Sequence, residues 1–138
     1  MNYALNNILV VDKDKDHKAL MKVYLEKIGV NNITFVTSGE EAIYHLRNNI
    51  FHAVFLGGEM PDMGGKQLVG TLRDNPVCCH HKLAMVSGLL SNPTSPSPPT
   101  SHEAALRVFL GFHYVLPIPK EGLNSDVLLH ALRKMVRV

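Results

Sequence analysis

Five short apolar runs, each followed by a more polar segment, constrain the fold more than any other feature of this sequence. The runs are rich in valine, isoleucine and leucine, as expected for strands that are buried on both faces of a sheet. They cover residues 8–11, 33–36, 53–56, 83–86 and 114–119. Because helical segments separate them, the pattern predicts a parallel sheet with right-handed crossovers and helices on both faces.

Capping signals place helices between these runs. Ser38 followed by Glu41 is a capping box, which predicts a helix that continues to about residue 47. Gly29 is a natural C-terminal stop for the helix before it. Near the end of the chain, either Asn124 or Ser125 can cap a last helix.

Prolines shape the segment from 91 to 100, which also holds several serines. Because proline lacks an amide donor and clashes with the preceding turn, this segment is predicted to be an exposed surface loop. A short helix is expected from Ser101, so the fourth helix of the fold is predicted to be shortened or replaced by the loop. The prolines at 117 and 119 predict that the last strand lies at an edge of the sheet.

Length and composition limit the classes of function. The 138 residues predict a single domain spanning 1–138. Hydrophobic residues make up 46% and charged residues 19%, which is ordinary for a soluble globular protein. The net charge of +2 forms no basic stripe, so we expect no nucleic-acid binding. No apolar run approaches a membrane span and no secretion signal is seen, which predicts a cytoplasmic or nuclear location.

The two cysteines are adjacent, at Cys78 and Cys79, and two histidines follow them. A tetrahedral zinc site needs separated ligand pairs, so this run is interpreted as structural. The eight histidines are otherwise scattered and form no catalytic pairing that spacing alone would indicate. The sequence therefore predicts no cofactor and no metal.

Several motifs together resemble the landmarks of response-regulator receiver domains. They are Ile8-Leu9-Val10-Val11-Asp12, Gly39-Glu40-Glu41-Ala42, Met60-Pro61-Asp62-Met63-Gly64-Gly65 and Ser87-Gly88. The resemblance covers nearly the whole chain. It implies a flavodoxin-like, CheY-like doubly wound sheet of five parallel strands in the order 2-1-3-4-5. It also implies a site with two acids after the first strand, an acceptor aspartate after the third, a hydroxyl after the fourth and a lysine after the fifth.

The resemblance also implies that this site is degenerate. Asp12 and Ser87 match the first acid and the hydroxyl, but Lys13 replaces the second acid, Gly57 the acceptor and Pro117 the lysine. An ammonium in place of a carboxylate reverses the local field that magnesium needs. Glycine offers no nucleophile, so the acceptor role is lost as well. The alternative interpretation of the glycine is a turn that needs positive φ.

The positions near the fifth strand leave two alignments open. Without a gap the lysine position is Pro117, and with a one-residue gap it is Ile118, while Lys120 lies beyond both. Tyr114 matches the family's aromatic switch, which would make Ser87 and Tyr114 a relay without an input. The alternative is a capped strand end and a half-buried aromatic side chain.

The resemblance implies a phosphorylation-independent pseudo-receiver, a protein-interaction module of a two-component phosphorelay and not an enzyme. The expected partner is a histidine-phosphotransfer protein or a sensor histidine kinase, bound by the first helix and the loops around the site. Because the loop remodels the face that receivers use to dimerise, we expect a monomer or a weak dimer.

Two alternatives stay open. Residual phosphoryl transfer or phosphatase activity could use Glu59, Asp62 or Ser87 as a substitute acceptor. Alternatively, Ser95 and Ser97, each followed by proline, could accept phosphate from proline-directed kinases and switch the module.

Overall fold

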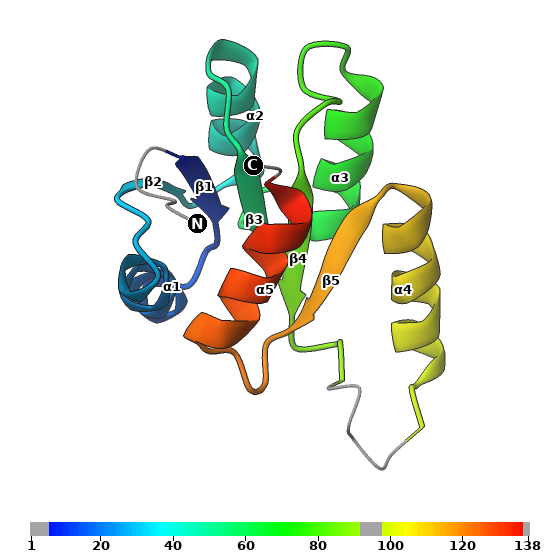
Figure 1. Ribbon diagram of the computed structural model, residues 1–138. Helices are drawn as coiled ribbons and strands as arrows, with labels where there is room; N and C mark the ends of the chain where they lie inside the picture. The colour runs from blue at the N-terminus through cyan, green and yellow to red at the C-terminus, as the bar shows by residue number, and fades with distance from the viewer. Residues whose placement is uncertain (1–5, 92–97, 137–138) are drawn as a thin grey trace.

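A sheet of five parallel strands forms the centre of the molecule in the computed structural model (Figure 1). The structure describes residues 6–91 and 98–136. The strands are β1 (Asn7–Val11), β2 (Asn32–Val36), β3 (Ala53–Gly57), β4 (Leu83–Ser87) and β5 (Val115–Pro119). They lie in the order β2-β1-β3-β4-β5 and every neighbouring pair is parallel, which confirms the predicted fold class. The proline-containing β5 lies at an edge, as predicted.

Helices cover both faces of the sheet (Figure 1). They are α1 (Lys15–Lys27), α2 (Gly39–Asn48), α3 (Gly65–Asp74), α4 (Ser101–Phe112) and α5 (Ser125–Met135). The apolar sides of α2, α3 and α4 pack on one face, and those of α1 and α5 pack on the other. In the described part of the chain, no helix has the length and apolar character needed to cross a membrane.

The double covering explains why the strands are apolar throughout. In β1, Leu9 and Val11 contribute to the core under α2, α3 and α4. Ile8 and Val10 contribute to the core under α1 and α5. Because successive strand side chains point to opposite faces, burial of both faces requires a continuous apolar run and not an alternating one.

The predicted helix ends are confirmed by their hydrogen bonds. The Ser38 hydroxyl accepts a bond from the Glu41 amide at 3.2 Å. The Asn124 side chain accepts one from the Val127 amide at 3.0 Å, which makes Asn124 the cap of α5 and not the serine after it. Gly29, just after α1, has a φ of 94°, a value that favours glycine.

The expectation of a shortened fourth helix is wrong. α4 is 12 residues long, against 13 for α1. The hydroxyl of Thr100 accepts a hydrogen bond from the Glu103 amide at 3.1 Å, so the helix begins directly after the prolines. Of the predicted loop, Ser91 and residues 98–100 are described, and none of them is helical. The proline-rich segment therefore precedes the fourth helix and does not replace it.

Candidate functional site

The carboxyl ends of the central strands surround a cavity of about 390 Å³. The chain leaves β1 toward β2 on one side and returns to β3 on the other, so the strand order reverses here. In doubly wound sheets this switch point is where ligands bind. The lining residues are Asp12, Lys13, Asp14, Gly58, Glu59, Val86, Ser87, Gly88, Leu89 and Lys120.

Asp12 is the buried carboxylate of this cavity, with 7% of its surface exposed. One oxygen, Oδ1, accepts a hydrogen bond from the Asp14 amide at 2.8 Å. The other, Oδ2, lies 2.5 Å from Nδ1 of the buried His17. Burial raises the pKa of Asp12, but the hydrogen bonds from His17 and Asp14 and the charges of His17 and Lys120 hold that pKa below its ordinary value.

His17 is a site residue that the sequence patterns did not reveal. Asp14 places it, because the Asp14 carboxylate accepts bonds from the Asp16 amide at 2.9 Å and the His17 amide at 3.3 Å and so caps α1. Among the described residues, Nε2 of His17 is buried without a hydrogen-bond partner. The signal in the sequence is a histidine in the first helical turn after a strand that ends in aspartate.

Gly57 ends β3 beside Asp12. A Cβ atom at Gly57 would lie 3.2 Å from Oδ2 of Asp12 and 3.3 Å from the carbonyl oxygen of Val11. Both distances are shorter than ordinary van der Waals contacts, so a side chain at position 57 would require Asp12 or its neighbours to move by a few tenths of an ångström. The described glycines with positive φ are Gly29 and Gly122, so the interpretation of Gly57 as a turn that needs positive φ is wrong.

Lys13 and Glu59 face each other across the mouth of the cavity. The Lys13 ammonium lies 3.2 Å from Oε2 of Glu59, and both side chains are exposed. An exposed pair of this kind contributes little to stability. Its effect is local. Glu59, one of the predicted substitute acceptors, is paired with the ammonium of Lys13.

Asp62, the other predicted substitute acceptor with a carboxylate, does not line the cavity. Its oxygens accept hydrogen bonds from the Gly39 amide at 2.8 Å and the Glu40 amide at 3.0 Å, at the start of α2. These bonds hold the pKa of Asp62 below its ordinary value. Asp62 therefore works with Ser38 as a cap of α2.

Ser87 lies where the sequence predicts, at the end of β4 in the cavity. Its buried hydroxyl accepts a hydrogen bond from the Leu89 amide at 3.1 Å, and its carbonyl accepts one from the Lys120 amide at 3.1 Å. A Cβ atom at Gly58 would lie 3.2 Å from this hydroxyl oxygen. The wall around Ser87 is therefore closely packed as well.

The fifth-strand positions differ from the expectation. Pro117 pairs with Met85 inside the sheet and does not line the cavity, and Ile118 is buried in the core. Lys120, directly after β5, does line the cavity, and its charge contributes to the lowered pKa of Asp12. The prediction that no lysine takes the place of the family's lysine is therefore wrong. Counting residues from Tyr114 gave Pro117 or Ile118 as the matching position. The pairing of β5 with β4 instead places Lys120 next to the end of the strand, at the cavity.

Tyr114 and Ser87 do not form a relay. Tyr114 precedes β5 at the amino end of the sheet, whereas Ser87 pairs with Pro119 at the carboxyl end. The tyrosine has a φ of 57° and is 87% exposed, so the expected half-buried position is also wrong. The predicted kinase sites Ser95 and Ser97 lie outside the described residues.

The site does not fit the magnesium ion that receivers hold. Magnesium prefers several oxygen ligands in octahedral geometry. Here Asp12 already makes one short polar contact through each oxygen, to His17 and Asp14, and Lys13 stands where a second acid would be. Within the described ranges, no group of three or more histidine, cysteine, aspartate or glutamate side chains is placed to hold a metal ion.

Solved structures share this fold. A sensor protein from Polaromonas sp. JS666 superposes with a TM-score of 0.77 at 20% identity, with 95% of each chain covered. A CheY-like receiver domain from Methylobacillus flagellatus gives 0.70 at 23% identity, covering 95% of this chain and 98% of its own. The chemotaxis response regulator CheY4 of Vibrio cholerae gives 0.73 at 18% identity, with coverage of 95% and 98%. These likenesses show the fold alone.

Sequence comparison is more specific. No curated protein sequence matches the chain. The sequence model of the response regulator receiver domain matches residues 8–94, which hold the first four strands and the cavity residues from Asp12 to Leu89. The chain therefore belongs to the response regulator receiver domain family.

Proposed function

We propose that this chain is a phosphorylation-independent receiver, a pseudo-receiver that serves as a protein-interaction module in two-component signalling. Receiver domains are generally signalling modules that interact with protein partners in such systems. One observation carries the proposal. Position 57, at the end of β3 beside Asp12, is a glycine and so has no carboxylate.

The chemistry of phosphoryl acceptance supports this proposal. A receiver needs a nucleophilic carboxylate and a cation that neutralises the transferring phosphoryl group. Asp12 is held through both oxygens, and Glu59 is engaged by Lys13. Asp62 caps a helix outside the cavity, and the Ser87 hydroxyl is buried against a backbone amide. Each candidate nucleophile thus has another role in this arrangement.

The proposed partner is a histidine-phosphotransfer protein or a sensor histidine kinase, bound without phosphate transfer. The proposed contact surface is α1 together with the loops around the cavity. α1 offers the exposed apolar side chains of Leu20 and Val23, which lie three residues apart and so on one side of the helix. Such exposed apolar side chains are suited to contact with another protein.

The chemical half of this proposal is tested by treatment with acetyl phosphate and Mg²⁺ followed by intact-protein mass spectrometry. We expect no phosphoryl adduct, while a receiver with a complete site, treated in parallel, becomes modified. An adduct on any side chain of the cavity, or a beryllofluoride complex there, would contradict the proposal. Peptide mapping then identifies whether Glu59, Asp62 or Ser87 carries it.

The binding half is tested by calorimetric titration with a purified histidine-phosphotransfer protein and with the cytoplasmic part of a sensor histidine kinase. We expect binding whose Kd is the same with and without acetyl phosphate and Mg²⁺. Absence of binding to both proteins removes this class of partner. Binding that appears only with the phosphodonor contradicts independence from phosphorylation.

A further inference from the structure

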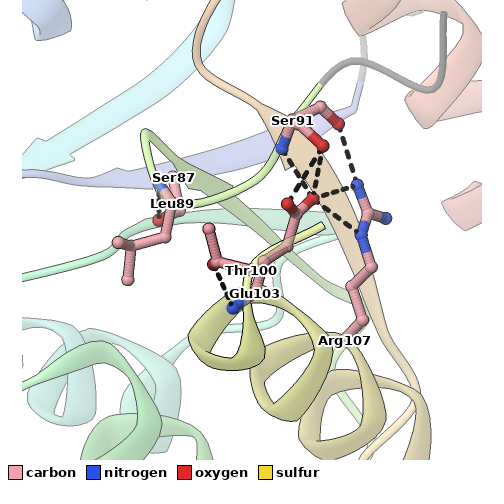
Figure 2. Close-up of polar contacts among 6 residues, drawn as sticks. All are labelled: Ser87, Leu89, Ser91, Thr100, Glu103 and Arg107. Atoms are coloured by element: carbon pink, nitrogen blue, oxygen red, sulfur yellow. Dashed lines mark hydrogen bonds and ion pairs between the residues drawn. The ribbon is translucent and has the colours of Figure 1, made fainter. Parts of the chain in front are cut away.

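The helix α4 is fixed at both ends by charged side chains, but in different ways. At its start, a cluster that we call the clasp joins Ser91, Glu103 and Arg107 (Figure 2). The carboxylate of Glu103 accepts hydrogen bonds from the Ser91 amide at 2.7 Å and from Nε of Arg107 at 3.1 Å. Nη2 of Arg107 donates to the Ser91 carbonyl oxygen at 2.9 Å. The clasp is thus an ion pair that closes around one backbone segment.

At the end of α4, Arg73 of α3 binds three backbone carbonyls. Its Nε donates to the carbonyl oxygen of His113, the residue that caps α4, at 2.9 Å. Its Nη1 donates to the carbonyl oxygens of Cys79 and His81, both at 2.8 Å. These two residues belong to the turn at 75–82, which leads into β4. We call Arg73 and its three carbonyl partners the latch, because they connect the end of α4 to this turn.

The turn contains a histidine that is packed in its neutral form. His81 is 2% exposed, and its ring stacks on His80 at 4.5 Å between centroids and lies 6.5 Å from the ring of Phe51. Nδ1 lies 3.0 Å from the carbonyl oxygen of Cys78. Because a carbonyl oxygen only accepts hydrogen bonds, Nδ1 carries the proton. Nε2 is then unprotonated, and among the described residues it is buried without a hydrogen-bond partner.

A proton on Nε2 would create a charge in unfavourable surroundings. Burial lowers the pKa of His81 below its ordinary value of 6.5. His80, stacked on the ring, and Arg73, bound to the His81 carbonyl, act in the same direction through their charges. Backbone groups of Cys78 and Asn49 favour the charged form, but burial prevails.

The other titratable side chains near the turn do not balance this charge. Burial raises the pKa of the Cys78 thiol, so the thiol stays neutral. Arg47 of α2 shares a surface cavity with His80, and its positive charge acts on the same thiol. A protonated His81 would therefore face neutral and cationic side chains, and a buried charge without a partner is costly.

The latch and the clasp differ in their response to acid. The hydrogen bonds of the clasp hold the pKa of Glu103 below its ordinary value of 4.5, so its carboxylate stays charged at about pH 5.5. The neutral form of His81, in contrast, stabilises the closed turn fully only above pH 6.5. This stabilisation is lost as the pH falls from 6.5 toward the pKa of the folded state, because the open turn takes up a proton that the closed turn does not.

We propose that the latch is an acid-sensitive switch that frees the C-terminal end of α4 while the clasp keeps the start of the helix in place. Protonation of His81 opens the turn, and Arg73 then loses two of its three carbonyl partners. Phe112 and Tyr114, both exposed, lie at the freed end, so acid changes how an apolar surface is presented. The inference goes beyond the proposed function, because neither the cavity nor a partner takes part.

Amide hydrogen exchange of the full chain at about pH 7.5 and about pH 5.5, corrected for the intrinsic exchange rate at each pH, tests the switch. Below pH 6.5 the opening equilibrium should rise by up to about tenfold per pH unit. We expect a rise of about fivefold or more at residues 78–81 and 112–114, and no rise at 101–104 beside the clasp. An unchanged equilibrium at 78–81 and 112–114, or an equal rise at 101–104, overturns the switch.

The role of His81 is tested in the same experiment by His81→Asn, which replaces the ring with an amide that can donate but does not titrate. We expect its acid response to disappear. The matched control is His130→Asn, because His130 is exposed on α5, and we expect this variant to keep the response. A response that persists in His81→Asn overturns the assignment to His81.

The connection to α4 is tested by Arg73→Lys, because an ammonium lacks the planar set of donors with which a guanidinium binds several carbonyls. We expect residues 112–114 to exchange faster already at about pH 7.5 and to lose most of their acid response, while 78–81 keep theirs. An unaltered response at 112–114 would show that Arg73 does not transmit the opening.

If His81→Asn does not fold, NMR titration of the His81 ring in the unmodified chain decides the question. We expect its Cε1 proton to report a pKa below 6.5. A pKa at or above 6.5 overturns the switch, since protonation would then not favour the open turn.

Discussion

The two walls of the cavity are built in different ways. The acid wall, formed by Asp12, Lys13 and Glu59 after the ends of β1 and β3, contains charged groups that pair with oppositely charged or polar neighbours. The clasp wall, formed by the segment from Ser87 to Ser91 and its contacts with α4, is neutral along the loop and is held by a buried carboxylate. The acid wall is where receivers do their chemistry, and the clasp wall borders the helix that follows β4.

This difference teaches that chemical capacity and structural order are separable in this fold. On the acid wall, a Cβ atom at Gly57 would lie within 3.2 Å of the Asp12 carboxylate. On the clasp wall, Glu103 and Arg107 add an interaction that fixes the loop. The loop after β4 is thus held in a defined arrangement by contacts that do not involve the acid wall.

The largest effect is expected just behind the acid wall, at Gly65, where α3 begins against the backbone of Gly57 and Gly58. A Cβ atom there would lie 2.8 Å from Cε of Met85 and 3.0 Å from the carbonyl oxygens of Gly57 and Gly58. Because backbone atoms cannot easily move aside, we expect Gly65→Ala to lower the free energy of unfolding by about 1–3 kcal/mol. Urea denaturation measures this change.

The control for that change is Gly70, which lies inside α3, where a Cβ atom would meet nothing within 4 Å. Gly70→Ala is expected to raise stability by about 0.5–1 kcal/mol, because alanine is the better helix former. If both substitutions have the same sign, close packing does not explain the glycine at position 65.

A smaller effect is expected from Asp12→Asn, which removes the charge that His17 faces. We expect a loss of about 1–2 kcal/mol in unfolding free energy near neutral pH, because hydrogen bonds to charged groups are stronger than neutral ones. The folded-state pKa of Asp12 is below the reference value of 3.8, so its carboxylate stabilises the protein above that pH. This stabilisation is lost as the pH falls through the folded pKa.

The measurement is urea denaturation of both proteins from neutral pH down to about pH 3. The gap between the unmodified chain and Asp12→Asn should narrow as the pH falls, because the protonated aspartate and the asparagine are then both neutral. A gap that stays constant or widens on acidification would mean that the Asp12 charge does not stabilise the folded state.

Much of the fold could be predicted from the sequence, because its signals are local. Continuous apolar runs predicted the strands, and Ser38 and Asn124 predicted helix starts through bonds to amides three residues away. The start of α4 at Ser101 was predicted, but its length was underestimated, because the proline-rich segment was expected to take the place of helical residues, whereas it ends before the Thr100 cap.

The candidate site was less predictable, because its contacts depend on strand register. Asp12 and Ser87 were predicted from the resemblance of their motifs to those of receiver domains, and both line the cavity. His17 was missed, since its role depends on an α1 cap that turns its ring toward Asp12. Lys120 was not predicted to lie at the cavity, and Tyr114 was predicted to lie near Ser87. Residue counting does not show which end of β5 a side chain occupies, because only the pairing of β5 with β4 fixes that.

A further comparison concerns Asp62, which lies close in sequence to the acid wall but has a structural role. Asp62→Ala removes the acceptor for the Gly39 and Glu40 amides at the start of α2. We expect a lower melting temperature, by less than the decrease in Asp12→Asn, and faster amide exchange in the first turn of α2. After treatment with acetyl phosphate and Mg²⁺, Asp62→Ala should carry no phosphoryl adduct, like the unmodified chain. If the melting temperature and α2 exchange are unaffected, the cap is not significant in solution.

The smallest effect is expected for the ion pair between Lys13 and Glu59. Both side chains are exposed, so water and salt screen their attraction. A double-mutant cycle of Lys13→Ala and Glu59→Ala should give a coupling free energy of about 0.2–1 kcal/mol that disappears in about 1 M salt. Urea denaturation of the four proteins measures it. A larger, salt-resistant coupling would show that the acid wall is held by its charges as firmly as by its packing, and the contrast with the clasp wall would then be lost.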